Sequence, residues 1–385
     1  MIPRDRVIAT LNHEEPDRVP IDLGSTIVTS IGRDSYRQLR TLLGLPPREL
    51  EIVDVVQQLP RVDEDVLEAL GVDVRGVFPN GPSTWKLDIK DEGDRWSYVD
   101  EWGSRLEMPK QDGHYFDWVE FPLKESTLDA LATFAWPNPD DPARYAGVRA
   151  RAQQAYDAGY ALVGTPPLGS DLLAMPQRTR GYAESMLDLA ADEAFVVAFL
   201  DRLLDIALRA WRHFLDEVGD LIQVAVTFED LGTQIGPLIS PAQYRRILKP
   251  RQRKIVDYIK SRSKAKVFLH SCGAVAEFIP DFVDIGIDIL NPIQVTAVGL
   301  EDTAKLKREW GKHLTFWGGA CATTTLAFGT VEDVRTEAAQ RVRDLMPGGG
   351  FVFAAVHNIQ SDIPAEKVVA LFETAREAGE YPVKA

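Results

Sequence analysis

The chain has 385 residues, enough for two average domains or for one α/β barrel with additional segments. Its 58 acidic and 43 basic residues give a net charge of −15, which argues against nucleic-acid binding, because that requires a basic face. The two cysteines do not make a disulfide framework, and neither a signal-length apolar stretch nor a membrane-span window is found, so a cytoplasmic protein is expected.

The N-terminal part of the sequence mixes helical and extended patterns. Helices are expected at 4–11, 36–43 and 62–70, and strands at 18–24 and 73–79. Residues 84–122 differ in kind, because apolar and polar residues alternate there around turn residues, which predicts an antiparallel β meander. Four of the eight tryptophans fall in this insertion. That enrichment fits either a partly exposed hairpin or a lid or partner surface.

From residue 143 onward, helices and strands alternate regularly. Helices are expected at 143–157, 193–218, 241–262, 274–284, 300–310, 331–345 and 364–377, and strands at 160–165, 221–228, 266–270, 287–290, 314–317 and 351–355. Short apolar strands that alternate with helices are typical of a parallel sheet. With the two N-terminal strands the count reaches about eight. The sequence therefore predicts a single (β/α)₈ barrel over residues 1–385, with the β insertion at about 84–122.

The ends of the predicted strands are the places to look for chemistry, because active sites of such barrels lie at the carboxyl ends of the strands. These positions hold Asp22, Asn80, Thr165, Glu229, Asp230, His270, Cys272, Asn291, Gln294, Cys321, His357 and Asn358. Two of the six histidines, both cysteines and an adjacent acid pair are thus expected on one face of the barrel.

The segment His270-Ser-Cys272 indicates a metal site. Two residues apart at a strand end, the imidazole and the thiol point to the same face, and both are zinc ligands. His357, Cys321 and the pair Glu229–Asp230 all stay open as the source of a further ligand, and the acids also as a general base or a partner of a histidine. The alternative is that His270 and Cys272 pack in a core.

Several segments carry a family resemblance. Residues 4–20 and the run His270-Ser-Cys272-Gly273 are the specific ones, and weaker blocks lie at 70–73, 286–294, 317–319 and 328–330. Together they resemble the uroporphyrinogen decarboxylase superfamily and, more narrowly, its zinc-dependent corrinoid methyltransferase branch. Residues 4–20 are similar to the N-terminal signature of the family, and His270 to Gly273 are similar to the metal motif of the methyltransferases.

The resemblance also suggests which residues bind the metal. Members of this branch often carry a Pro-Gly-Cys run after the last strand, where this chain has Ala355-Val-His357-Asn358. The implied zinc ligands are therefore His270, Cys272 and His357, with the fourth ligand open. Cys321 does not occupy a ligand position of the family and is less favoured.

A function follows from the resemblance as an expectation. It implies transfer of a methyl group from a small methoxylated donor, with aromatic methyl ethers as the first expectation, to the cobalt of a corrinoid protein. The expected cofactors are zinc and a corrinoid that the partner protein supplies; nucleic acid and membrane are not expected partners, and a homodimer stays open. The residues expected to act on the substrate are Glu229 and Asp230 as catalytic groups and Asn80, Gln294 and Asn358 as binding groups.

Three alternative functions stay open. One is transfer from a methylcorrinoid to tetrahydrofolate or a thiol. The second is uroporphyrinogen decarboxylation, which is less favoured because only Arg33 and Arg37 remain where the decarboxylases carry an arginine-rich segment after the first strand. The third is a non-catalytic interaction module that uses the Trp-rich insertion as its contact surface.

Overall fold

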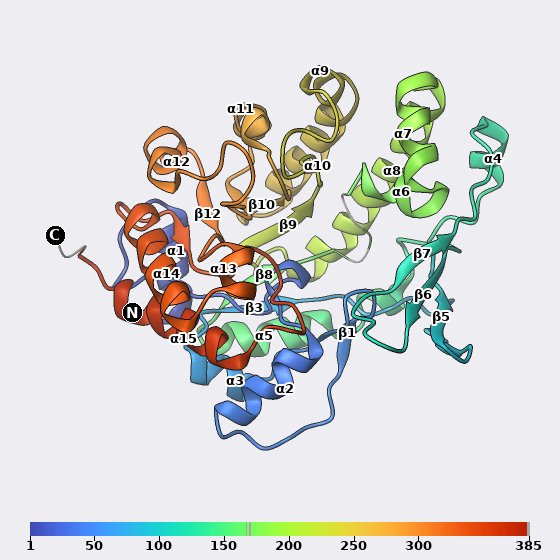
Figure 1. The fold of residues 1–385 in the computed structure, drawn as a ribbon. Coiled ribbons are helices and arrows are strands. Elements are labelled where there is room, and N and C mark those ends of the chain that lie inside the picture. Colours follow the sequence, from blue (N-terminus) through green and yellow to red (C-terminus); the bar gives the residue numbers. More distant parts are fainter. Residues whose placement is uncertain (167, 169–170, 383–385) are drawn as a thin grey trace.

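The computed structural model describes residues 1–166, 168 and 171–382. Its centre is a parallel sheet with the strand order β13-β12-β11-β10-β9-β8-β3 (Figure 1). The strands are β3 (Val74–Val77), β8 (Ala161–Gly164), β9 (Val224–Phe228), β10 (Lys266–His270), β11 (Ile289–Asn291), β12 (Thr315–Trp317) and β13 (Phe351–Val352). They are almost completely buried, as expected for parallel strands that are covered on both faces.

Residues 20–22 join the two edges of this sheet and close it into a barrel. The N–H of Asp73, just before β3, donates to the carbonyl of Ile21 over 2.9 Å. On the other edge, Phe353 donates to the carbonyl of Pro20 and accepts from the N–H of Asp22, both over 2.8 Å. The predicted (β/α)₈ barrel is confirmed. The predicted strand 18–24 is shorter than expected and makes only isolated bridges, because Pro20 has no N–H to continue a ladder.

Helices surround the barrel (Figure 1). They are α1 (Pro3–Leu11), α2 (Arg33–Leu42), α3 (Glu64–Leu70), α4 (Leu128–Thr133), α5 (Val148–Asp157), α6 (Ala174–Arg180), α7 (Tyr182–Ala191), α8 (Glu193–Val218), α9 (Pro241–Gln243), α10 (Lys249–Arg262), α11 (Ile279–Asp284), α12 (Thr303–Trp310), α13 (Thr323–Phe328), α14 (Val331–Leu345) and α15 (Ala365–Ala378), with short turns η1 (Ile27–Thr29), η2 (Pro142–Arg144), η3 (Tyr244–Leu248) and η4 (Ala276–Phe278). Within the described residues, no helix combines the length and the apolar character needed to cross a bilayer.

Several helical regions differ from the prediction. The helices expected at 143–157 and 274–284 begin with the separate turns η2 and η4, and the short helices α4 and α13 are not predicted. The single helix expected at 241–262 is divided into α9, the π-helical turn η3 and α10. Pro250, near the start of α10, has no N–H for a regular helical hydrogen bond, and the wider turn precedes it. The sequence does not predict α6 and α7, because Pro176 and Gly181 interrupt the pattern there. Pro176 is tolerated since it lies in the first turn of α6, whose N–H groups need no helical partner.

The insertion forms the predicted antiparallel meander. Its strands β4 (Lys90–Asp91), β5 (Arg95–Val99), β6 (Arg105–Pro109) and β7 (Asp117–Glu120) pair in chain order. Next to it lies the two-stranded sheet of β1 (Ile52–Asp54) and β2 (Leu59–Pro60) (Figure 1). A small second core holds the insertion against this hairpin, with Tyr98, Leu106 and Phe116 packed around Val55 and Val56.

A buried ion cluster fastens the closure of the barrel. The carboxylate of Asp73, which is 1% exposed, accepts hydrogen bonds from Arg6 Nη1 over 2.6 Å and from Arg18 Nη1 over 2.7 Å. The same carboxylate accepts from the N–H of Ile21 over 2.8 Å. One acid therefore joins the N-terminal helix, the closing segment and β3.

Replacing Asp73 should destabilise the whole barrel. In Asp73→Ala the half-buried guanidinium of Arg18 loses its counter-charge, and the buried one of Arg6 keeps only its pair with Asp17. We therefore expect the free energy of unfolding to fall by about 3–5 kcal/mol in urea titrations. The matched control is Asp34→Ala, which removes an exposed pair with Arg37 and should change stability by at most about 1 kcal/mol. Equal losses in the two variants would contradict the assigned role of Asp73.

Candidate metal centre

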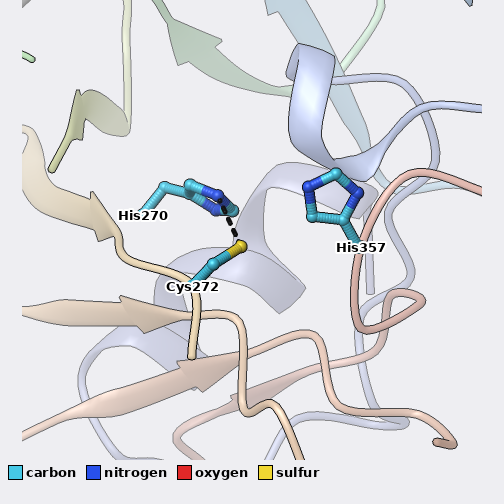
Figure 2. Close-up of side chains that lie close together, drawn as sticks. All are labelled: His270, Cys272 and His357. Carbon is cyan, nitrogen blue, oxygen red and sulfur yellow. Dashed lines mark hydrogen bonds between the residues drawn. The ribbon is translucent and has the colours of Figure 1, made fainter. Parts of the chain in front are cut away.

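Three side chains from two separate loops converge at the carboxyl ends of the strands (Figure 2). His270 is the last residue of β10, Cys272 follows it, and His357 lies in the loop after β13. Their ligand atoms all lie within 4.8 Å of one another, and Cys272 Sγ is 3.2 Å from His270 Nε2. Figure 2 shows the ring of His357 facing the other two side chains from the opposite side. The structure thus brings together the three residues expected to bind the metal.

An asparagine orients His270. Its Nδ1 lies 2.6 Å from Asn291 Oδ1, and Asn291 Nδ2 donates to the carbonyl of Trp317 over 2.8 Å. Because the amide nitrogen is committed to Trp317, the amide oxygen must accept from His270, which places the imidazole hydrogen on Nδ1. The lone pair of Nε2 then faces the Cys272 thiol, where a cation could take the place of the thiol hydrogen. Sequence reasoning placed Asn291 at a strand end but assigned it no role.

A second asparagine orients His357 in the same way. His357 Nδ1 hydrogen-bonds to Asn358 Oδ1, and Asn358 Nδ2 donates to Gln57 Oε1 over 2.6 Å. Nε2 of His357 is therefore also left with a free lone pair. Burial lowers the pKa of His357, and the charge of His270 acts in the same direction, so the ring favours the neutral form that binds metals. Asn358, expected to contact substrate, has its amide engaged in holding this histidine.

The loop that carries Cys272 is held by direct contact between two backbones. A Cβ on Gly273, whose φ is +85°, would lie 2.4 Å from the carbonyl carbon of Gly232, so only glycine fits after the cysteine. The N–H of Cys272 donates to Asp230 Oδ1 and that of Gly273 to Gln294 Oε1, over 2.8 and 2.7 Å. Gln294, also expected to contact substrate, thus supports the loop of the cysteine.

The donor set fits zinc. Tetrahedral Zn²⁺ with nitrogen at about 2.0–2.1 Å and sulfur at about 2.3 Å separates its ligand atoms by about 3.3–3.6 Å. The 3.2 Å between Cys272 Sγ and His270 Nε2 is close to this range, and small side-chain rotations would bring His357 nearer. Burial, and then the charge of Asp230, raises the pKa of the Cys272 thiol well above its usual value. A bound cation would offset that effect and favour the thiolate.

The two adjacent acids occupy different environments. Glu229 is fully buried, and its carboxyl group accepts from the N–H groups of Leu172 and Leu173 over 3.1 and 2.7 Å and from Gln252 Nε2 over 3.1 Å. Burial raises its pKa well above the usual value, and the charge of Asp171 adds to the effect. Glu229 therefore anchors the end of the loop before α6.

Asp230, by contrast, lies beside the cluster, with Oδ1 3.7 Å from His270 Nε2. A third acid, Asp171, is also close: burial raises its pKa, and the charge of Asp230 adds to this effect. Sequence reasoning missed Asp171 because it lies well beyond the end of β8, outside the strand-end positions. Counting acids in the loop after β8 would have found it.

Two further candidates lie apart from the cluster. Asn80 donates from Nδ2 to the carbonyls of Ala143 and Ala146 over 2.9 and 2.8 Å, and its Oδ1 accepts from Arg151 over 2.9 Å. These bonds tie together the loop before α5. Cys321 is 2% exposed, and burial raises the pKa of its thiol to about 12. It is not one of the converging ligand residues.

One family model matches the part of the chain that contains the candidate metal centre. A model of the family described as "Uroporphyrinogen decarboxylase (URO-D)" matches residues 172–378, just over half of the chain, and this range contains all three cluster residues. No curated protein sequence matches the chain significantly.

Solved structures with a similar backbone were also found. A methyltransferase from Methanosarcina mazei is 18% identical and superposes with a TM-score of 0.64, covering 98% of this chain and 99% of that chain. A GH113 β-1,4-mannanase (11% identity, TM-score 0.33, covering 61% and 79%) and a β-glycosidase from Thermosphaera aggregans (12%, 0.39, 96% and 98%) are too distant to carry an argument. The first match shows a shared fold over nearly the whole length.

The two cysteines offer a matched test of the metal centre. Protein purified without chelators should contain about one zinc per chain, and Cys272→Ala should lose it because one of the three donors is gone. Cys321→Ala should keep its zinc, since that thiol is buried away from the cluster. Elemental analysis of the three proteins decides the matter, and undiminished zinc in Cys272→Ala would rule the site out.

Proposed function

The chain belongs to the uroporphyrinogen decarboxylase family, and from this premise we propose that it is a zinc-dependent methyltransferase. It transfers a methyl group from a small methoxylated donor, first of all an aromatic methyl ether, to the cobalt of a corrinoid held by a partner protein. The observation that carries the proposal is the convergence of His270, Cys272 and His357 at the mouth of the barrel, where each imidazole keeps its hydrogen on Nδ1 and so has a lone pair on Nε2. The fold shared with a methyltransferase supports it.

In the proposed reaction the chain binds and orients the donor and handles a proton. His270, Cys272 and His357 would hold the ion, and zinc bound there supplies Lewis acidity towards the ether oxygen of the donor. Asp230, beside this position, delivers the proton that the departing oxygen needs. The methyl–oxygen bond breaks as the cobalt(I) of the partner's corrinoid forms a bond to the methyl carbon, giving methylcobalt(III) and the free alcohol or phenol.

The two adjacent acids have distinct roles in this proposal. Glu229 already accepts three hydrogen bonds and holds the loop before α6. Asp230 accepts a hydrogen bond from the N–H of Cys272 and lies closer to the cluster. We therefore assign the proton transfer to Asp230 and a supporting role to Glu229.

The proposed partner needs a surface at the mouth of the barrel. Ile235, in the loop after β9, is 84% exposed, and Val298, after β11, is 52% exposed. The two loops touch, because the N–H of Val298 donates to the carbonyl of Gln234 over 3.1 Å. This pair of apolar side chains lies on the same loops as Asp230 and Gln294, where a corrinoid protein would have to dock.

Uroporphyrinogen decarboxylation is the second candidate, because the matching family model carries that description. A polycarboxylated substrate needs free cations. Arg33 and Arg37, the two arginines after the closing segment, both pair with Asp34, over 3.3 and 3.0 Å. This pairing weighs against the decarboxylase.

Methyl transfer can be tested directly. Zinc-loaded protein, cob(I)alamin or a reduced corrinoid protein, and a panel of methoxylated donors should yield methylcob(III)alamin, followed by its absorbance. Cys321→Ala should retain the activity and Cys272→Ala should lose it, since only Cys272 belongs to the cluster. Decarboxylation of uroporphyrinogen without methyl transfer from any donor would overturn the proposal in favour of the second candidate.

The role of Asp230 makes a separate prediction. Asp230→Asn keeps an oxygen that accepts from the N–H of Cys272 but removes the acid, so transfer from an anisole-type donor should slow by about 10²-fold or more. A methyl ether of nitrophenol should be affected far less, because its leaving oxygen needs little protonation. Equal losses with both donors, measured as initial rates at equal zinc content, would assign Asp230 to the loop structure alone.

A further inference from the structure

We propose that the insertion completes the metal centre from a distance, with Tyr115 as a positioning residue that acts on His357 through Gln360 and Asn358. The inference rests on the proposed zinc site and assigns a role to a segment that the reaction itself does not use. It is carried by a continuous path of hydrogen bonds from the meander to the ring of the histidine.

The path consists of three links. The hydroxyl of Tyr115, between β6 and β7, donates to Gln360 Oε1. Gln360 Nε2 then donates to Asn358 Oδ1 over 2.8 Å. Asn358 Oδ1 also accepts from Nδ1 of His357. Tyr115 and Gln360 are 245 residues apart in the sequence, so this path exists only in the folded protein.

The direction of these bonds decides which nitrogen of His357 can bind a cation. A hydroxyl that donates to Oε1 of Gln360 leaves the amide nitrogen of Gln360 as the donor to Asn358. Asn358 must then present its oxygen to His357, which keeps the imidazole hydrogen on Nδ1 and the lone pair on Nε2. If the amide of Asn358 turned round, its NH₂ group would face Nδ1, and the hydrogen would move to Nε2.

The small core of the insertion holds Tyr115 in place. Its neighbour Phe116 is 1% exposed, donates its N–H to the carbonyl of Val56 over 2.8 Å and packs against the ring of Tyr98 at 5.0 Å between ring centroids. Burial raises the pKa of Tyr115, so the hydroxyl keeps the proton that it donates. The hairpin of β1 and β2 also contributes to this network: Gln57, between the two strands, accepts a hydrogen bond from Asn358 Nδ2 over 2.6 Å.

The test compares two tyrosines of the insertion. Tyr115→Phe removes the first donor of the path, whereas Tyr98→Phe removes a hydroxyl that makes no hydrogen bond among the described residues. Competition with a chromophoric chelator should show zinc affinity about 10–100-fold weaker in Tyr115→Phe and unchanged in Tyr98→Phe. The visible absorption of the cobalt(II)-loaded proteins should change in the same variant only, a readout that a general loss of stability would not produce.

A second variant changes the middle residue of the path. Gln360→Glu keeps an acceptor for Tyr115 but cannot donate to Asn358, so its zinc affinity should fall by a similar factor. If Tyr115→Phe fails to fold, as judged by circular dichroism, this variant decides. Wild-type zinc affinity in both variants would overturn the inference without contradicting the proposed zinc site. Absence of zinc binding in the wild-type protein would instead overturn the proposed function along with it.

Discussion

The curvature of the parallel sheet is the constraint on which the site depends. β10 and β13 are separated by two strands, so in a flat sheet they would lie about 14 Å apart, three spacings of about 4.8 Å. The ligand atoms of His270, at the end of β10, and of His357, in the loop after β13, nevertheless lie within 4.8 Å of each other. Closing the sheet through residues 20–22 turns the strand ends towards one another across the mouth. The ion cluster of Asp73 therefore supports the cluster of His270, Cys272 and His357, although it lies at the opposite, amino-terminal ends of the strands.

Local patterns in the sequence predict much of this architecture. The alternation of apolar strands and helices predicts the barrel, and the strand-end rule predicts that His270, Cys272 and His357 face the same side. What the sequence does not predict depends on contacts between distant residues. A strand pattern cannot reveal that Pro20 limits the closing segment to bridges, nor that Pro176 begins a helix instead of ending one. The roles of Asn291 and Tyr115 depend on which amide atom accepts and which donates, and that is decided by partners on other strands and in the insertion.

The acid pair after β9 illustrates how one strand end can serve two purposes. Successive side chains of an extended chain point to opposite sides, so adjacent carboxyl groups meet different surroundings. Glu229 is taken into the protein, where burial raises its pKa and the N–H groups of Leu172 and Leu173, together with Gln252, compensate the lost hydration. Asp230 stays at the mouth and caps the loop of Cys272. The buried Glu229 thus holds the residues before α6 in place, while Asp230 remains beside the cluster.

The three cluster residues are held by two different sets of contacts. Backbone contact between Gly232 and Gly273, together with the bond from Cys272 to Asp230, locks the loops after β9 and β10 into one unit that carries His270 and Cys272. His357 is held instead by hydrogen bonds that run through its own loop to the insertion. An ion bound there would take two ligands from one of these sets of contacts and the third from the other.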